Sequence, residues 1–430
     1  MLATAWATLV HRLYTADEPA TLGVIALPLL ALSDMKDPQN LAEVVDGCGG
    51  SYKALALTLM QNISQAVANS KSEMAVTSIT PILLFLSDVS RTSPDFVAYL
   101  LSHGIISSLV SALDIDGVPP PAEGVPDRPV EVELCLGSLI QYLNVSPGYP
   151  WTVQALQAGL LRRIITSSAK MATASDAGKY PKLLGTVLPR SLVFYPVIAG
   201  MKKSFFQLET LSRSEEFSRS VLYGLWNVLK ALVDERVKVL DTWEASGRAS
   251  SLACDNMKRA DWIDGHRDEC HVLLSAHLTY AEIGLHYREK SFIRALLHSD
   301  YQRLRVVISI HMLQFMTENP GTSFFVAFDY TGATGVELSV LPVAKLGPTI
   351  QIPHWGRLAR AGGRLTLHAI RIGHGANWSN AIFPLRATSS QFSDGLVRIA
   401  SGINGLQYSQ VEALVRDLIE TTDRENTEIH

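Results

Sequence analysis

The sequence predicts a mainly α-helical protein that ends in a small α+β unit. Apolar residues recur at helical spacing through most of residues 1–245, and glycine or proline separates the helical stretches. Alternation of apolar and polar residues appears only after residue 323. We therefore expect a helical region over 1–245, a short central module over 246–275, and a helical connector with an α+β unit over 276–430.

The helical region contains one long apolar stripe in its last part. Residues at helical spacing form this stripe, and they are Leu222, Leu225, Trp226, Leu229, Leu232, Val233, Val237 and Leu240. Ser212 and Glu215 have the spacing of a capping box, which predicts that the helix begins there. Earlier helices are predicted at 51–69, 75–89, 93–113, 131–143 and 150–168.

Two phrases in the helical region are alike. Leu101-Ser-His-Gly104 and Leu156-Gln-Ala-Gly159 each end an apolar helix at a glycine, and a new apolar helix follows directly. Glycine at such a joint can adopt the left-handed conformation and turn the chain sharply. The phrasing resembles armadillo-like repeats, in which each helical unit buries its apolar face against its neighbours. An armadillo-like array is therefore favoured over a closed helical bundle.

The C-terminal unit is predicted to contain strands and a final helix. Phe324–Tyr330 and Val336–Leu341 flank a glycine-containing turn and predict a β-hairpin. Residues 350–352 and 364–372 are further strand candidates. The last helix is predicted to begin near Ser409, three residues before Glu412.

Composition limits the class of protein. The chain has 430 residues, 47% hydrophobic residues and a formal net charge of −4, which gives no general attraction to nucleic acid or acidic membranes. Its four cysteines do not suggest a disulfide framework, so we expect a reducing compartment, the cytoplasm or the nucleus. The longest apolar run, 22–32, contains Pro28 and is too short to span a bilayer.

The central module carries potential metal ligands. His266 and Cys270 are separated by three residues, which places an imidazole and a thiol on one face of a helix. Both groups are good zinc ligands, and Cys254 lies a short way upstream. The sequence therefore predicts that zinc, if bound, is held by Cys254, His266 and Cys270, whereas the alternative is a short helix with an unliganded cysteine and histidine.

The same residues resemble a MYND-type zinc finger. Cys254-Asp-Asn-Met resembles the opening of that finger, and Arg-Ala-Asp-Trp with His266-x3-Cys270 resembles its close. The resemblance implies that Cys254 corresponds to the first zinc ligand of the family, and His266 and Cys270 to the last two. The intervening ligands have no counterpart, because the chain passes from Met257 directly to Lys258 and Arg259. This gap suggests the hypothesis that a segment of the finger is missing.

The resemblance implies a function in binding other proteins. Family members with an intact finger look like adaptors that hold proline-containing peptides, and an extended helical array offers a surface for a protein partner. We therefore expect a non-enzymatic adaptor with a degenerate zinc-binding module. The proposed partners are proteins, with no membrane and no nucleic acid among them.

Two alternatives concern the C-terminal unit. No acidic residue occurs between Glu337 and Asp394, whereas basic and aromatic residues are interleaved there, which could form a surface for anions or nucleic acid. These residues are Lys345, Arg357, Arg360, Arg364, Arg371, Arg386, His354, His368, His374, Trp355 and Trp378. The other alternative is an enzyme whose site lies in the α+β unit.

Overall fold

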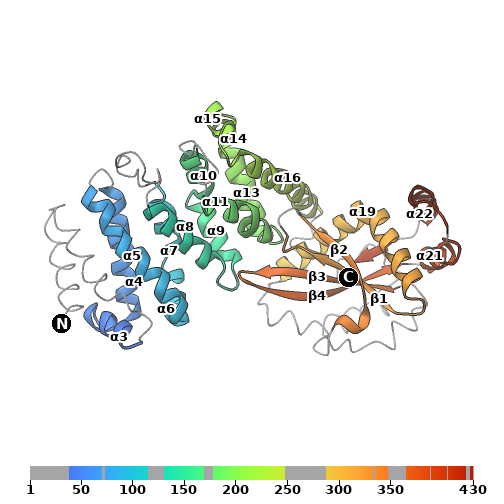
Figure 1. Cartoon of the computed structure of the whole chain (residues 1–430), viewed down its shortest axis with the longest axis horizontal. Helices are drawn as coiled ribbons and strands as arrows, with labels where there is room; N and C mark the ends of the chain where they lie inside the picture. Colours follow the sequence, from blue (N-terminus) through green and yellow to red (C-terminus); the bar gives the residue numbers. More distant parts are fainter. Residues whose placement is uncertain are drawn as a thin grey trace. The chain divides into compact units, whose positions relative to one another are not determined.

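The computed structural model describes residues 38–69, 73–114, 130–168, 178–246, 287–332, 335–346, 365–387, 389–403, 405–422 and 427–429. The described residues are mainly helical, with a small sheet near the C-terminal end (Figure 1), which confirms the predicted fold class. The chain divides into two compact units. Unit 1 is 1–188 with 200–230, and unit 2 is 189–199 with 231–430.

Unit 1 repeats one arrangement, in which two helices meet at a glycine and a third helix follows. The first repeat contains α3 (Pro38–Gly47), α4 (Tyr52–Ala68) and α5 (Glu73–Thr92). The second contains α6 (Pro94–Ser102), α7 (Ile105–Ala112) and α8 (Val130–Leu143). The third contains α9 (Tyr149–Gln157), α10 (Leu160–Ser168) and a last helix that begins as α11 (Tyr180–Lys182) and continues as the π-helix η2 (Leu183–Val187) and α12 (Leu188–Arg190).

The glycines at the joints have the predicted backbone conformation. Gly104 has φ +95° and Gly159 has φ +89°, in the left-handed region that favours glycine. Gly49, with φ +104°, lies at the equivalent place before α4, and the three glycines are evenly spaced along the chain. The turn at Gly104 sets α6 and α7 at 76° to each other. The sequence pattern revealed the second and third joints but not the first, because Gly49-Gly50-Ser51 lacks the phrase that the other two share.

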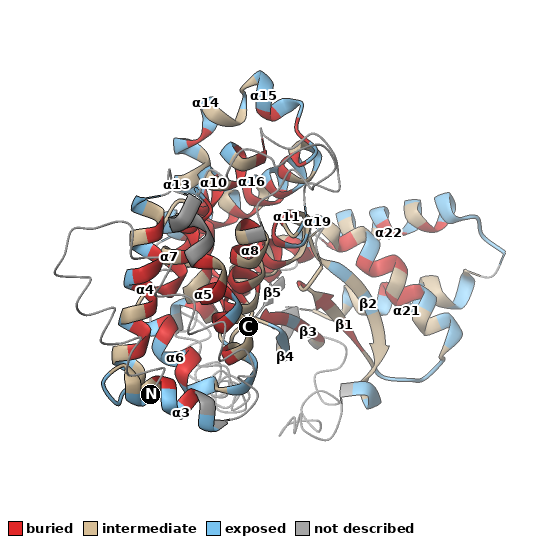
Figure 2. Ribbon diagram, turned by 60° about the vertical axis from the view of Figure 1, so that its left-hand side comes forward, coloured by how far each residue is buried: buried red, intermediate tan, exposed pale blue. Residues whose placement is uncertain are grey.

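The third helices of consecutive repeats lie side by side. Thr80 of α5 donates a hydrogen bond to Glu131 of α8 over 2.7 Å, and the hydroxyls of Ser90 and Tyr142 are 2.9 Å apart. Both contacts join residues in the same order along the two helices, so α5 and α8 run parallel, as equivalent helices of stacked repeats do. Figure 2 shows that the faces between these helices are buried.

One predicted helix start in unit 1 is wrong. Ser212 ends α14 (Glu209–Ser212), and it is Ser214 whose Oγ accepts from the backbone of Phe217, 3.2 Å away, to cap α15 (Glu215–Ser218). The long helix α16 (Tyr223–Ala245) begins only afterwards. Phe217 anchors the short helix α15, because it is fully buried with its ring centroid 5.4 Å from that of Trp226.

Within the described ranges no single helix is long and apolar enough to cross a membrane, although the bent pair α6 and α7 meets the length and composition test when taken together. The long helix of unit 2, α19 (Tyr287–Glu318), falls within the helical connector that the sequence predicts.

The sheet of unit 2 has the strand order β2-β1-β3-β4-β5. β1 and β3 are parallel and the other neighbours are antiparallel. Its elements are β1 (Phe324–Asp329), β2 (Glu337–Pro342), the 3-10 helix η5 (Val343–Leu346), β3 (Leu365–His374), β4 (Asn377–Ala387) and β5 (Thr427–Ile429), with helices α21 (Gln391–Gly402) and α22 (Tyr408–Thr422) before β5. The predicted hairpin, the strand at 364–372 and the last helix are confirmed. The candidate strand 350–352 lies outside the described residues, and the sequence pattern missed β4 and α21.

The two faces of the sheet have different surroundings. One face of the sheet packs against α19 (Figure 1). Phe328 and Ile370 are fully buried on this face, on the same side of the strands as His368, whose ring contacts Tyr301 of α19. Phe325, Leu367 and Ala369 form a second buried cluster on the opposite face. Both faces of the central strands therefore contribute to the core of unit 2.

Close packing of α21 on α22 predicts a sensitive glycine. A Cβ atom at buried Gly395 would lie against both methyl groups of Leu418, 2.9 Å from Cδ2. We expect Gly395→Ala to lower the free energy of unfolding by about 1–3 kcal/mol, because Leu418 must move to make room. Gly402→Ala on the same helix is the control, since nothing lies within 4 Å of its added Cβ. Thermal denaturation of both variants checks this prediction, and an equal effect of the two substitutions would contradict it.

Candidate functional site

The three predicted zinc ligands cannot be placed. Cys254, His266 and Cys270 lie in 247–286, outside the described residues. Where the structure does describe the chain, no group of three or more His, Cys, Asp or Glu residues could hold a metal ion. The two described cysteines are poor ligands, because burial raises the pKa of Cys48 to about 12 and that of Cys135 still further. The prediction of a zinc site therefore depends on the central module alone.

Only part of the predicted basic surface lies on the outside of the molecule. His368 and His374 are buried, so the expectation that they belong to a basic surface is wrong. They are even-numbered residues of β3, and even-numbered positions of this strand face the interior, as Ile370 and Ile372 do. The side chains of His354, Trp355, Arg357, Arg360, Arg364 and Arg386 lie outside the described residues, and Lys345 is exposed on η5.

Arg371 and Trp378 come together at the surface. The guanidinium carbon of Arg371 lies 4.4 Å from the centre of the Trp378 ring, and the Trp378 side chain is 56% exposed. Arg371 Nη1 is also 3.0 Å from Asp329 Oδ2, because β1 and β3 are paired at these two residues. Asp329 is held in turn by Thr331, whose backbone N–H and hydroxyl both donate to Oδ1. We call Asp329, Arg371 and Trp378 the Trp378 surface.

The register of the sheet extends the Trp378 surface into a polar row. Glu337 of β2 is paired with Asp329, and Asn380 of β4 is paired with Arg371. Paired residues lie on the same face, so two carboxylates, one guanidinium and one amide share this part of the sheet. The local charge is balanced to slightly acidic, although the sequence from 338 to 393 contains no acidic residue. Sequence spacing could not reveal this, since Asp329 and Glu337 come from strands earlier in the chain.

A second aromatic feature lies in unit 1. Ring contacts lead from the buried core to the surface along Phe85, Phe96, Tyr52, Tyr99 and His103, with centroid separations of 6.5, 5.4, 6.0 and 6.1 Å in that order. Phe85 and Phe96 are buried, whereas Tyr99 is 44% exposed. We call this set the aromatic ladder. It fixes an exposed tyrosine on the first two repeats through contacts that extend into their core.

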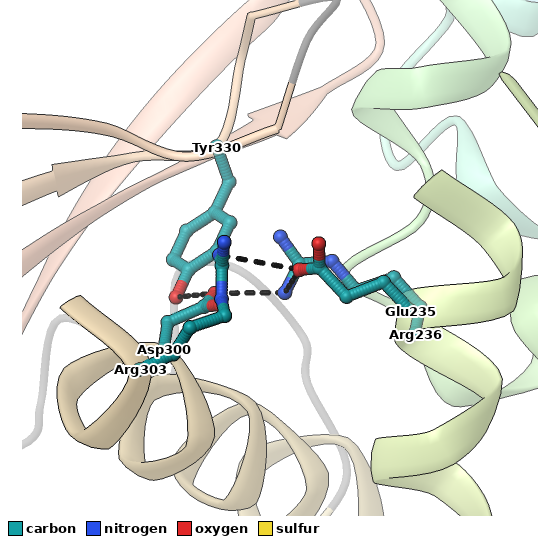
Figure 3. Close-up of polar contacts among 5 residues, drawn as sticks. All are labelled: Glu235, Arg236, Asp300, Arg303 and Tyr330. Carbon is teal, nitrogen blue, oxygen red and sulfur yellow. Dashed lines mark hydrogen bonds and ion pairs between the residues drawn. The ribbon is translucent and has the colours of Figure 1, made fainter. Parts of the chain in front are cut away.

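A polar cluster of unit 2 is centred on the buried Asp300 (Figure 3). The Asp300 carboxylate accepts hydrogen bonds from Arg236, Arg303 and the Tyr330 hydroxyl, over 2.7, 2.7 and 2.9 Å. Arg303 also lies 3.2 Å from Glu235 Oε1. Burial and the Asp300 carboxylate raise the pKa of Tyr330 well above its ordinary value, which keeps the phenol protonated as a donor.

This cluster joins three elements of unit 2. Glu235 and Arg236 come from α16, Asp300 and Arg303 from α19, and Tyr330 from the end of β1 (Figure 3). Each of these side chains is hydrogen-bonded to or ion-paired with another member of the cluster, which is typical of a structural ion network. The sequence contained a signal for it, because Arg236 lies between Val233 and Leu240 on the apolar stripe of α16, where a charged residue needs a buried partner.

Comparisons with known proteins identify no relative. No family model matches the chain, and no curated protein and no solved structure is significantly similar to it. Function is therefore inferred from the arrangement of the chain's own residues.

Proposed function

We propose that the chain is a non-enzymatic protein–protein interaction adaptor, present in the cytoplasm or nucleus. The observation that carries this proposal is the Trp378 surface, where an indole that is more than half exposed is fixed by Arg371 and Asp329. Tryptophan, tyrosine and arginine are the side chains that contribute most to protein interfaces. A side chain that is already held in place loses less conformational entropy on binding, so this surface is suited to a protein partner.

The helical repeats support the same proposal. Stacked repeats of the armadillo-like kind form an extended surface, and the aromatic ladder places the exposed Tyr99 on it. Among the described residues, Tyr99 of unit 1 and Trp378 of unit 2 are thus exposed aromatic side chains that contact other rings or charged groups. An adaptor with two contact surfaces could bind two partners.

Two alternative functions of unit 2, namely anion or nucleic-acid binding and catalysis, are less well supported by the geometry. Among the described residues of the Trp378 surface, Arg371 is paired with Asp329 and Glu337 lies on the same face, so these residues supply no excess positive charge for phosphate groups. The ion network around Asp300 is buried and its groups satisfy one another, which favours a structural role over a catalytic one. Protein binding is therefore the better proposal for this unit.

The proposed adaptor includes the degenerate zinc module. Cys254, His266 and Cys270 would be its ligands, as thiolate, imidazole and thiolate, and proline-containing peptides would be its partners. We expect zinc to remain with the purified chain after dialysis and to be lost in Cys270→Ser. The control is Cys48→Ser, which should retain the metal because Cys48 lies in the described repeat region, away from the three ligands in sequence. Elemental analysis measures zinc per chain, and equal content in all three proteins would contradict the site.

The adaptor function is tested by substituting the exposed aromatic residues. We expect Trp378→Ala to weaken capture of one set of proteins by about 30-fold or more, as the loss of an interface hot spot does. Tyr99→Ala should weaken the capture of a different set of proteins, because it too removes an exposed aromatic side chain from a binding surface. The matched control is Val397→Ala, since Val397 has the same exposed fraction as Trp378, 56%. The measurement is affinity purification of the tagged chain with quantitative mass spectrometry, after circular dichroism has shown that each variant is folded. Identical partner sets from all four proteins would contradict the proposal.

A further inference from the structure

His368 is a buried polar residue between the sheet and α19. It lies in β3, paired with Val326 of β1 and with Phe383 of β4. Its imidazole is fully buried, with ring centroids 5.3 Å from Tyr301 of α19 in an edge-on arrangement and 5.6 Å from Phe328 of β1. The ring is thus enclosed mainly by aromatic side chains, at the point where α19 packs on the central strands.

The imidazole of His368 must be neutral in this position. Neither ring nitrogen has a hydrogen-bond partner of good geometry among the described residues. A charged imidazolium would lose its hydration here, and the backbone of Thr366 compensates this loss only in part, which is unfavourable. Burial accordingly lowers the pKa of His368 to about 3, and the backbone of Thr366 acts weakly in the opposite direction.

The charged and titratable groups near His368 do not compensate a positive charge. On α19, Tyr301 is uncharged, because burial raises its pKa, and its hydroxyl is hydrogen-bonded to the cationic Arg305. Asp300 precedes Tyr301, but its carboxylate already accepts from Arg236, Arg303 and Tyr330. The paired positions on β1 and β4 are valine and phenylalanine. A proton on His368 therefore cannot be accommodated while α19 is seated on the sheet.

We infer that His368 is an acid-sensitive contact, and that its protonation releases α19 from the sheet. The released form binds the proton at the ordinary pKa of histidine, near 6.5, whereas the seated form resists it. The contact therefore contributes its full stabilisation of the seated form above about pH 6.5, and this contribution decreases as the pH falls toward 3. In this interval each pH unit shifts the equilibrium toward the released form by up to about tenfold.

The experiment compares the wild-type chain with His368→Phe at several pH values. Phenylalanine keeps an aromatic ring at this position but binds no proton. We expect the unfolding equilibrium constant of the wild type, relative to His368→Phe, to rise by about 50-fold between pH 6.5 and pH 4.5, because a histidine with the ordinary pKa is already half protonated at pH 6.5. The control is the same comparison for His311→Phe, because His311 lies on the same helix but is only part-buried. If the ratio of the unfolding equilibrium constants of the wild type and His368→Phe stayed constant over this pH range, the inference would be overturned.

A second measurement covers the case in which His368→Phe does not fold. Hydrogen exchange of the wild type, corrected for the intrinsic dependence of exchange on pH, reports the release of α19 directly. We expect amides of Tyr287–Glu318 that face the sheet to lose protection between pH 6.5 and pH 4.5 before those of α4 and α5 do. Simultaneous loss of protection in all these helices, or retained protection of α19 at pH 4.5, would overturn the inference.

Discussion

Replacing Asp300 with alanine is expected to lower the free energy of unfolding by about 3–5 kcal/mol. Asp300 is 1% exposed and accepts from two guanidinium groups and the Tyr330 hydroxyl, so its removal leaves the buried Arg236 without its nearest carboxylate. Removing one partner of a buried ion pair costs more than the pair contributes, because the remaining charge stays desolvated. Equilibrium denaturation in urea at neutral pH measures the difference.

Asp329→Ala is the matched control for Asp300→Ala. Asp329 also pairs with an arginine, but its side chain is 27% exposed and Arg371 is 44% exposed, so we expect a loss of only about 1 kcal/mol or less. The double variant Arg236→Met with Asp300→Leu should lose less stability than Asp300→Ala, since apolar residues replace both charges. Equal losses of unfolding free energy in Asp300→Ala and Asp329→Ala would show that the ion network around Asp300 contributes no more to stability than an exposed ion pair does.

Replacing Trp226 with alanine is expected to cost about 3–5 kcal/mol in unit 1. Trp226 is 1% exposed, and its ring lies 4.8 Å from Phe205 of α13 (Tyr195–Gln207) and 5.4 Å from Phe217 of α15, measured between centroids. The substitution leaves a cavity among these rings that the short helix α15 can fill only in part. Thermal and urea denaturation give the loss, with Val228→Ala on the same helix as control.

Val228 is 48% exposed, so its truncation should change the stability by no more than about 0.5 kcal/mol. Both variants place alanine on the same helix, and they contrast the loss of a buried aromatic side chain with the loss of an exposed aliphatic one. If both variants lost the same small amount, the aromatic contacts of Trp226 would not hold α15 in place.

Local patterns were sufficient to predict much of the helical region. The joints at Gly104 and Gly159 were predictable because a left-handed turn between two helices favours one residue type, and that residue occurs in a recognisable phrase. The hairpin of β1 and β2 was predictable for a similar reason, since alternation on both sides of a glycine-containing turn is a short-range signal. Both features depend on neighbours in the sequence.

The features that sequence patterns missed depend on distant residues. β4 begins with the polar residues Asn377, Ser379 and Asn380 and was not predicted, because its strand conformation comes from pairing with β3. The capping assignment failed because the buried Phe217 anchors the short helix α15 before α16. His368 was placed on a surface because nothing near it in the sequence indicates that α19 covers β3.

The candidate site was predicted only in part for the same reason. Arg371 and Trp378 were singled out together, and they do lie in contact. Their predicted role in binding anions depended on the absence of acidic residues nearby, but Asp329 lies opposite Arg371 once β1 and β3 pair. A carboxylate from another strand thus offsets the positive charge on which the anion-binding hypothesis depended.

The central claim is that one chain holds two different protein partners through separate surfaces. The most direct test is native mass spectrometry of the complex purified on the tagged full-length chain. We predict a mass equal to one chain with one copy of each partner, loss of one partner with Trp378→Ala, and loss of the other with Tyr99→Ala. A chain that always leaves the column alone, or two partners that only ever replace each other, would contradict the account.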